Sequence, residues 1–305
     1  MSFFIQNERW GTDVQEQNEL KIEHICKCYN RGKKQALKDF SVTLTPGIYA
    51  LLGPNGAGKS TLMNILTDSL RADSGTISFN GTNVLKMGSA YRQILGYMPQ
   101  QQGMYDEFTA VGFLKYMAAL KALKKKEAKE QIETLFRRVG LEKEMRQKIG
   151  GFSGGMKQRL LIAQALLGNP KILLMDEPTA GLDPYERIRL RNFISEIAED
   201  KIVIFATHVV SDIEFIAKEV LLLKNGTLLY QDTVEELNKK IDGKVFEVTV
   251  DFENVPSVKE SFKVSNICRK DGKCVMRILS DERPAMDGVK EVVPQLEDLY
   301  LYTTT

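Results

Sequence analysis

The stretch GPNGAGKST, residues 53–61, has the residue types and spacing that hold a phosphate group. Its glycines let the loop curl so that successive backbone N–H groups point at an anion. Lys59 can reach the β- and γ-phosphates of a nucleotide, and the Ser60 hydroxyl can ligate Mg²⁺. The apolar run IYALL precedes the loop and TLMNIL follows it, so we expect a strand, the loop and a helix whose N-terminus adds positive potential.

A pair of acids follows a second apolar run, KILLM, at residues 171–175. The run predicts a buried strand, and Asp176 and Glu177 stand at its C-terminal end, where ligands bind in open α/β sheets. Asp176 can hold Mg²⁺, and Glu177 is placed to orient and polarise an attacking water. An acidic pair alone is usually a solvated turn, but the buried strand and the phosphate loop together favour the catalytic interpretation.

A second glycine-rich segment, IGGFSGGMKQR at residues 149–159, offers another anion site. Ser153 supplies a hydroxyl, Gly154 and Gly155 supply accessible backbone N–H groups, and a helix is expected to begin there. One chain hardly needs two such segments for one nucleotide.

The elements that must position these residues are predicted by apolar periodicity. Strand patterns alternate with helical patterns, which indicates a largely parallel sheet covered on both faces. Strands are expected at 20–29, 37–44, 47–53, 171–175, 201–207 and 220–226, a hairpin at 74–84, and helices between 109 and 140 and at 154–168, 184–198 and 209–217. The pattern shifts past Gly243, where strands, a hairpin turning at Asp271-Gly272 and a closing helix at 295–304 predict a small second domain over 240–305. Residues 1–19 are expected to be a loose extension.

Composition excludes several classes. The formal net charge of +2 does not indicate nucleic-acid binding, and no uncharged apolar run approaches the length of a membrane span. Four cysteines without a C-x-x-C pair, with only two histidines, argue against a Cys/His metal site and favour reduced thiols.

In order and spacing, these motifs resemble the nucleotide-binding subunit of ABC transporters over residues 20–235. Gln100, which ends YMPQ, matches the glutamine that touches Mg²⁺ and relays to the membrane subunit, although Gln101 and Gln102 leave that assignment open by one position. FSGGM matches the signature segment, AGLD ends in Asp183, and ATHVV carries His208, the switch histidine. Tyr29 matches the aromatic that stacks on adenine, with simple packing as its alternative.

The resemblance implies ATP and Mg²⁺ as ligands and assigns a role to each site residue. Catalysis falls to Glu177 and His208, metal contacts to Ser60, Gln100 and Asp176, and nucleotide contacts to Tyr29, Gly53, Pro54, Asn55, Gly56, Ala57, Gly58, Lys59, Ser60, Thr61, Ser153, Gly154, Gly155 and Asp183. The signature departs from the common LSGGQ at Phe152 and Met156, and both changes spare the residues that meet phosphate.

The implied fold is α/β: a P-loop NTPase (RecA-like) core with an antiparallel β-subdomain, a helical subdomain at about 102–168, and a small α+β C-terminal domain. Two cassettes would meet head to tail around two MgATP, so that the second glycine segment serves the partner's γ-phosphate. The partner cassette would be a second copy or a different chain.

The chain is most similar to ATP-binding subunits of ABC-2-type exporters. This similarity implies a separate permease that docks near Gln100, and a cytoplasmic location on the inner face of the membrane. The alternatives are a soluble ABC-type ATPase acting on ribosomes or DNA, and a regulatory nucleotide-binding module without turnover. The sequence does not indicate the cargo.

Overall fold

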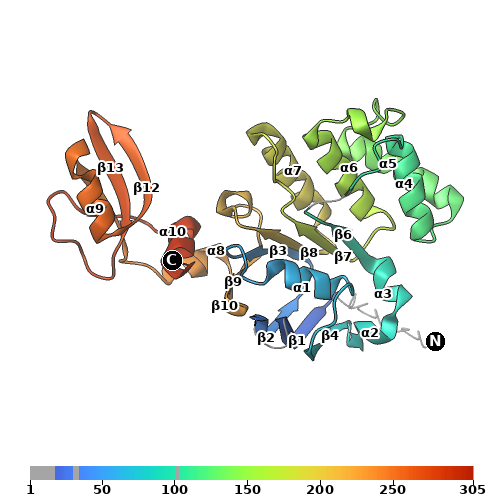
Figure 1. Ribbon diagram of the computed structural model, residues 1–305, viewed down its shortest axis with the longest axis horizontal. Coiled ribbons are helices and arrows are strands. Elements are labelled where there is room, and N and C mark those ends of the chain that lie inside the picture. The colour runs from blue at the N-terminus through green and yellow to red at the C-terminus, as the bar shows by residue number, and fades with distance from the viewer. Residues whose placement is uncertain (1–17, 30–33, 101–102, 305) are drawn as a thin grey trace, which may run out of the picture.

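The computed structural model describes residues 18–29, 34–100 and 103–304 (Figure 1). Most of the extension predicted at residues 1–19 lies outside the described residues, as do Gln101 and Gln102. The larger body contains two sheets and a group of helices, and the C-terminal elements form a smaller body that projects from it.

The central sheet has the strand order β10-β9-β3-β8-β7-β6. Its strands are β3 (Gly47–Leu52), β6 (Leu95–Met98), β7 (Ile172–Asp176), β8 (Ile202–Thr207), β9 (Glu219–Lys224) and β10 (Thr227–Asp232). All neighbours pair in parallel except β9 and β10, which form an antiparallel hairpin. Strands β7 and β8 are buried along their whole length, as expected for a parallel sheet covered on both faces. The predicted α/β fold is confirmed.

Alternate residues of β3 enter two different hydrophobic cores because successive side chains of a strand point to opposite faces. Ile48 and Ala50 belong to the core shared with α6 (Gly154–Leu166) and α7 (Pro184–Ile197). Tyr49 belongs to the core shared with α1 (Lys59–Leu66) and a second sheet.

That second sheet is antiparallel, with the order β2-β1-β4-β5. Its strands are β1 (Leu20–Tyr29), β2 (Lys34–Leu44), β4 (Ser74–Phe79) and β5 (Thr82–Asn83), and the short helices α2 (Val84–Met87) and α3 (Ser89–Ile94) lead on to β6. The hairpin expected at 74–84 is therefore confirmed.

Four helical segments form the group at the other end of the cassette: α4 (Ala110–Leu120), α5 (Lys125–Val139), the 3₁₀ turn η1 (Ile149–Gly151) and α6. The Thr109 hydroxyl accepts a hydrogen bond from the Gly112 N–H at 3.1 Å and so caps the start of α4. Gly140 ends α5 with a left-handed backbone, φ 63°. Within the described ranges, no helix has both the length and the apolar character that a bilayer span requires.

The C-terminal body is built on a sheet of order β12-β13-β11-β14. Its elements are α8 (Val234–Lys239), β11 (Val245–Val250), η3 (Phe252–Asn254), α9 (Val255–Ser261), β12 (Lys263–Lys270), β13 (Lys273–Leu279), β14 (Lys290–Glu291) and α10 (Leu296–Thr304). One face of the sheet packs on α9 through Val258. The other face contributes Val245 and Leu279 to the main core of the cassette, together with Leu296 and Leu299 of α10. Hydrophobic packing is thus continuous across residue 240.

One helix expected from the sequence is not formed, and several observed elements were not predicted. The helix expected over 209–217 was wrong: the chain forms only the 3₁₀ turn η2 (Val210–Asp212). The apolar spacing there reflects buried Val210 and Ile213, but Val209 is extended, and several of the backbone bonds that follow are tight i to i+3 bonds. Helix α9 was not predicted, since its seven residues carry only one fully buried side chain.

Candidate functional site

The loop between β3 and α1 is shaped by close backbone approaches that only glycine permits. A Cβ on Gly58 would lie 2.5 Å from the Ala36 carbonyl oxygen, and Gly58 has a φ of 113°. A Cβ on Gly53 would lie 2.3 Å from the Leu223 carbonyl oxygen at the end of β9. The neighbouring strands therefore fix the curl of this loop in front of the N-terminus of α1.

Lys59 lies folded against the loop that it follows. Its ammonium group donates to the carbonyl oxygens of Gly53 at 2.5 Å and Pro54 at 3.3 Å. Burial lowers the pKa of Lys59, and the charges of Glu177 and Asp176 oppose that shift. The ammonium is thus held among oxygen acceptors at the place where the loop can receive phosphate.

The two acids at the end of β7 differ in their surroundings. Asp176 is buried; burial first, and then the charge of Glu177, raise its pKa, while the charge of Lys59 and the Ser60 hydroxyl oppose that shift. Glu177 follows with a φ of 49°, a left-handed conformation that is uncommon for a non-glycine residue. Its backbone N–H donates to Ala206 at 2.9 Å, so strand β8 holds the residue in this strained position.

Both carboxylate oxygens of Glu177 have a partner at the end of β8. His208 Nδ1 lies 2.7 Å from Oε1, and the Thr207 hydroxyl donates to Oε2 at 3.1 Å. Glu177 is 5% exposed, whereas about half of the His208 side chain is exposed, so the histidine connects a buried carboxylate with the open cleft.

These groups share one cleft of about 240 Å³. Its lining residues are Tyr29, Lys34, Ala36, Pro54, Asn55, Gly56, Ala57, Gly58, Lys59, Ser60, Thr61, Gln100, Asp176, Glu177 and His208. The Tyr29 hydroxyl lies 3.4 Å from the Thr61 hydroxyl at the rim. Lys34 and Ala36 were not among the predicted residues; the only available signal was a cation five positions after Tyr29.

The second glycine segment lies outside this cleft. Ser153 caps α6 by accepting from the Met156 N–H at 3.2 Å, and a Cβ on Gly154 would meet nothing within 4 Å. Asp183 caps α7 by accepting from the Glu186 N–H at 2.9 Å. None of Ser153, Gly154, Gly155 and Asp183 lines the cleft. The structure thus brings the phosphate loop and the acids together and leaves these four residues apart.

Comparison with known proteins identifies the family. The ABC transporter family model matches residues 37–180. A curated relative, the uncharacterised ABC transporter ATP-binding protein YxlF of Bacillus subtilis, is 38% identical over 232 residues, which are 76% of each chain. The linearmycin resistance ATP-binding protein LnrL of the same organism is 33% identical over 81% of this chain and 78% of its own. A solved ATP-binding subunit of an ABC transporter superposes with a TM-score of 0.65 at 27% identity, over 72% of this chain and 92% of its own.

This chain belongs to the ABC transporter family. It is an ATP-hydrolysing subunit, and the cassette of such a subunit binds ATP. The predicted fold class, with its β-subdomain and helical subdomain, is the fold of this family.

The oxygen donors of this ABC cassette fit a magnesium ion. Mg²⁺ prefers hydroxyl, amide and carboxylate oxygens and keeps several waters. Ser60, Gln100 and Asp176, which supply these three groups, all line the cleft. When bound with ATP, the ion would neutralise charge on the β- and γ-phosphates.

Two further contacts of the cassette were missed by sequence reasoning. Thr207 holds Glu177, and its only signal was its place immediately before His208. Thr179, two residues after Glu177, donates to the buried Asp212 of η2 at 2.5 Å. Sequence reasoning did not predict this bond, because a helix over 209–217 would not require Asp212 to face the interior.

Proposed function

We propose that this cassette binds MgATP in the described cleft, hydrolyses it through Glu177, pairs head to tail with a second cassette, and drives export by a separate permease. The observation that carries the proposal is the arrangement of Glu177, His208 and Thr207 beside the phosphate loop. A carboxylate held at both oxygens at the edge of the cleft is suited to orient a water toward the γ-phosphate.

His208 has a supporting part in this scheme. Its Nδ1 contacts Glu177 while the remaining ring is exposed toward the cleft, so it can hold the carboxylate and also reach the nucleotide. The intact Glu177–His208 pair disfavours a regulatory module without turnover.

Pairing of two cassettes is supported by the position of the signature segment. Ser153, Gly154 and Gly155 stand at the start of α6 outside the cleft of their own chain. An anion-binding arrangement that its own nucleotide does not use is available to the nucleotide of a partner. A second copy of this chain is the simplest partner.

A surface suited to a permease lies in the segment that follows Gln100 in the sequence. Tyr105, Phe108 and Tyr116 are exposed yet pack on one another, with ring centroids 5.1–6.0 Å apart. Exposed aromatic clusters of this kind mark protein interfaces.

Phe108→Glu should abolish co-purification with a permease expressed from the neighbouring genes and leave the ATPase activity of the isolated subunit intact. Unchanged co-purification would contradict this docking surface.

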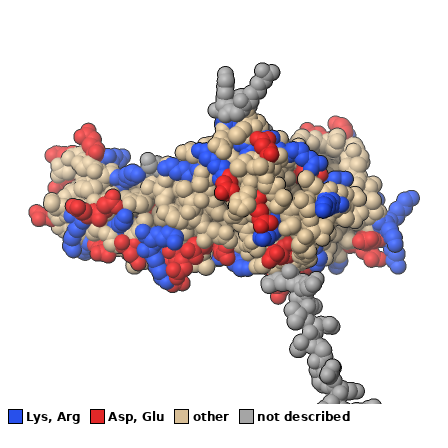
Figure 2. Space-filling view, turned by 90° about the horizontal axis from the view of Figure 1, so that it is seen from below, with Lys and Arg blue, Asp and Glu red and all other residues tan. Residues whose placement is uncertain are grey.

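Export is the direction favoured by the relatives, because LnrL is named for linearmycin resistance. The alternative of a ribosome- or DNA-acting ATPase is less well supported. On the face shown in Figure 2, basic and acidic side chains are interspersed, without the continuous basic surface that nucleic acid requires. We place the subunit on the cytoplasmic side of the membrane, bound through the permease.

Substitution Glu177→Gln tests the catalytic assignment. The amide keeps the size of the side chain but cannot serve as a base, so turnover should fall about a hundredfold or more. ATP binding should remain, because Lys59 and the phosphate loop are unchanged. Glu196→Gln, at an exposed position near the other end of α7, is the matched control and should hydrolyse ATP normally. Near wild-type hydrolysis by Glu177→Gln would refute the assignment.

A further inference from the structure

Helix α10, the last element of the chain, returns from the C-terminal body to the cassette (Figure 1). It packs against η2, the turn that begins two residues after His208. Leu296 and Leu299 of α10 enter the same core as Val210 and Ile213 from the η2 segment. The C-terminal helix therefore forms part of the support on which the segment after His208 rests.

The η2 segment is tied in turn to the residues that follow Glu177. Asp212 is 2% exposed and accepts from the Thr179 hydroxyl at 2.5 Å. Val209 donates its N–H to the Thr207 hydroxyl, which itself donates to Glu177. A chain of contacts thus runs from α10 through η2 and Thr207 to Oε2 of Glu177, and His208, which contacts Oε1, lies in the same segment.

The other end of α10 contacts the end of strand β9. Lys224, the last residue of β9, donates from its ammonium group to the Thr303 carbonyl at 2.7 Å, a favourable contact for a cation at a helix C-terminus. Its neighbour Leu223 provides the carbonyl that closely approaches Gly53 of the phosphate loop.

Tyr300 lies between the two ends of α10 and is partly buried against the core. Burial, and then the charge of Glu177, raise the pKa of the Tyr300 phenol.

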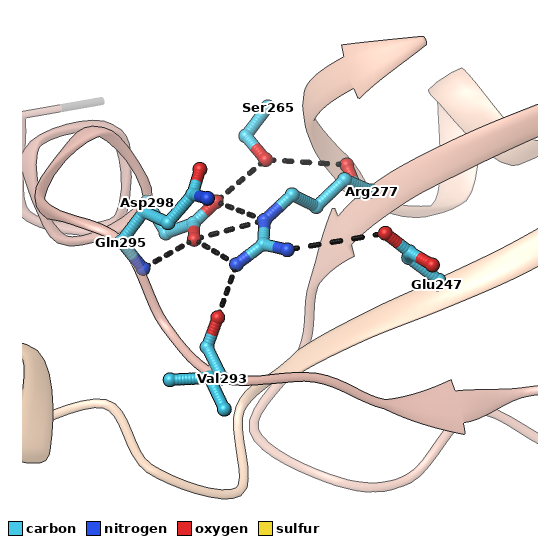
Figure 3. Close-up of polar contacts among 6 residues, drawn as sticks. All are labelled: Glu247, Ser265, Arg277, Val293, Gln295 and Asp298. Atoms are coloured by element: carbon cyan, nitrogen blue, oxygen red, sulfur yellow. Dashed lines mark hydrogen bonds and ion pairs between the residues drawn. The ribbon is translucent and has the colours of Figure 1, made fainter. Parts of the chain in front are cut away.

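A buried ion pair locks α10 onto the C-terminal sheet (Figure 3). Asp298 is 1% exposed and accepts from Arg277 Nε at 3.0 and 3.1 Å and from Nη2 at 2.7 Å. The Ser265 hydroxyl and the Gln295 N–H also donate to it, at 2.7 and 2.8 Å. A buried carboxylate with this many donors has one well-defined orientation, so the helix that carries it is fixed in direction.

We propose that α10 is a positioning element of the ATPase site, which supports η2 and thereby keeps the segment that carries His208 in place beside Glu177. Tyr300 packs against the core that α10 shares with η2, and the Arg277–Asp298 ion pair fixes α10 on the C-terminal sheet. This rests on the proposed role of Glu177 and His208. The C-terminal body would then set the rate of hydrolysis and leave nucleotide binding, which depends on the phosphate loop, largely unaffected.

Tyr300→Ala, compared with Tyr302→Ala, tests the proposal in the full-length chain. Both residues are partly buried tyrosines of α10, but the Tyr302 hydroxyl bonds Lys244 and Asp281 of the C-terminal body. Tyr300→Ala should lower kcat for ATP hydrolysis about tenfold, since small displacements of catalytic groups cost that much or more. KM for ATP should change by less than about twofold. Tyr302→Ala should leave both constants unchanged, and Tyr300→Leu should restore part of kcat by refilling the contact.

A second measurement does not depend on turnover. Asp298→Asn should break the Arg277–Asp298 ion pair and speed amide hydrogen exchange in the peptide 208–214 relative to wild type. Exchange in the phosphate loop should be unchanged. An unchanged kcat in folded Tyr300→Ala, or unchanged exchange at 208–214 in Asp298→Asn, overturns the proposal. Failure of the proposed function would be seen separately, as full hydrolysis by Glu177→Gln with wild-type α10.

Discussion

At the scale of single residues, the site contains two buried carboxylates, Asp176 and Glu177, whose surroundings stabilise their charges to different degrees. Each carboxylate oxygen of Glu177 has a hydrogen-bond partner. Asp176 instead has a raised pKa, because burial disfavours its charge. An acid whose pKa is raised on folding costs stability while it is ionised. Ionised Asp176 therefore lowers the stability of the nucleotide-free fold, as expected for a residue kept for a metal ion.

Asp176→Asn should consequently raise the unfolding temperature of the nucleotide-free protein at pH 7. The sign follows from the direction of the shift: above the raised pKa the wild type buries a charge, and below it the carboxyl is neutral like asparagine. The gain should therefore shrink as the pH falls through the raised pKa of Asp176. Thermal unfolding at a series of pH values measures it.

Asp73→Asn is the matched control with the opposite sign. The hydrogen bond from Lys27 lowers the pKa of Asp73, so its charge favours the folded state above the ordinary carboxyl pKa. This variant should not be more stable than wild type at pH 7, and any deficit should vanish as the pH falls through the lowered pKa. An Asp176→Asn protein less stable than wild type at pH 7 would contradict the role given to burial.

At the scale of elements, the sequence was informative wherever one physical pattern dominated. The run KILLM predicts a buried strand, and GPNGAGKST with its flanking apolar runs predicts a strand, a loop and a helix, because apolar periodicity and glycine spacing both act locally. The helix predicted after His208 was wrong because contacts with Thr179 and α10 determine which positions of this segment are buried, among them Val210 and Asp212. Such contacts join residues distant in sequence, so no local pattern reports them.

The Thr179–Asp212 bond gives a test at this scale. Thr179→Val keeps the shape of the side chain but leaves the buried Asp212 carboxylate without this donor, which should cost about 1–3 kcal/mol of unfolding free energy. Thr179→Ser keeps the hydroxyl and should cost less, about the value of one buried methyl group, roughly 1 kcal/mol. Urea unfolding measures both variants. A Thr179→Val protein as stable as Thr179→Ser would show that the hydroxyl has no structural part.

At the scale of the whole molecule, one chain contains two anion-binding segments that do not meet. The phosphate loop and the acids share a cleft, whereas Ser153 and Asp183 each cap a helix away from it. Because the main core extends through Leu279 and Leu299 into the C-terminal body, the parts of one chain are packed in a fixed arrangement. We infer that the second segment is completed by another cassette and not by closure within the chain.

Mixing two inactive variants tests this central claim most directly. Lys59→Ala spoils the phosphate loop, and Ser153→Glu places a carboxylate where the partner's γ-phosphate should lie, so like charges repel. In a mixed head-to-tail dimer both lesions fall in one composite site and the other site is intact. With free exchange and independent sites, an equal mixture should recover about a quarter of wild-type activity, since about half of the dimers are mixed and each has one good site. A mixture of Lys59→Ala with Glu177→Gln should stay inactive, because both residues belong to the same half of each site. Recovery in the first mixture alone is the predicted result; no recovery in either, together with no ATP-dependent dimer in sedimentation, would contradict the account.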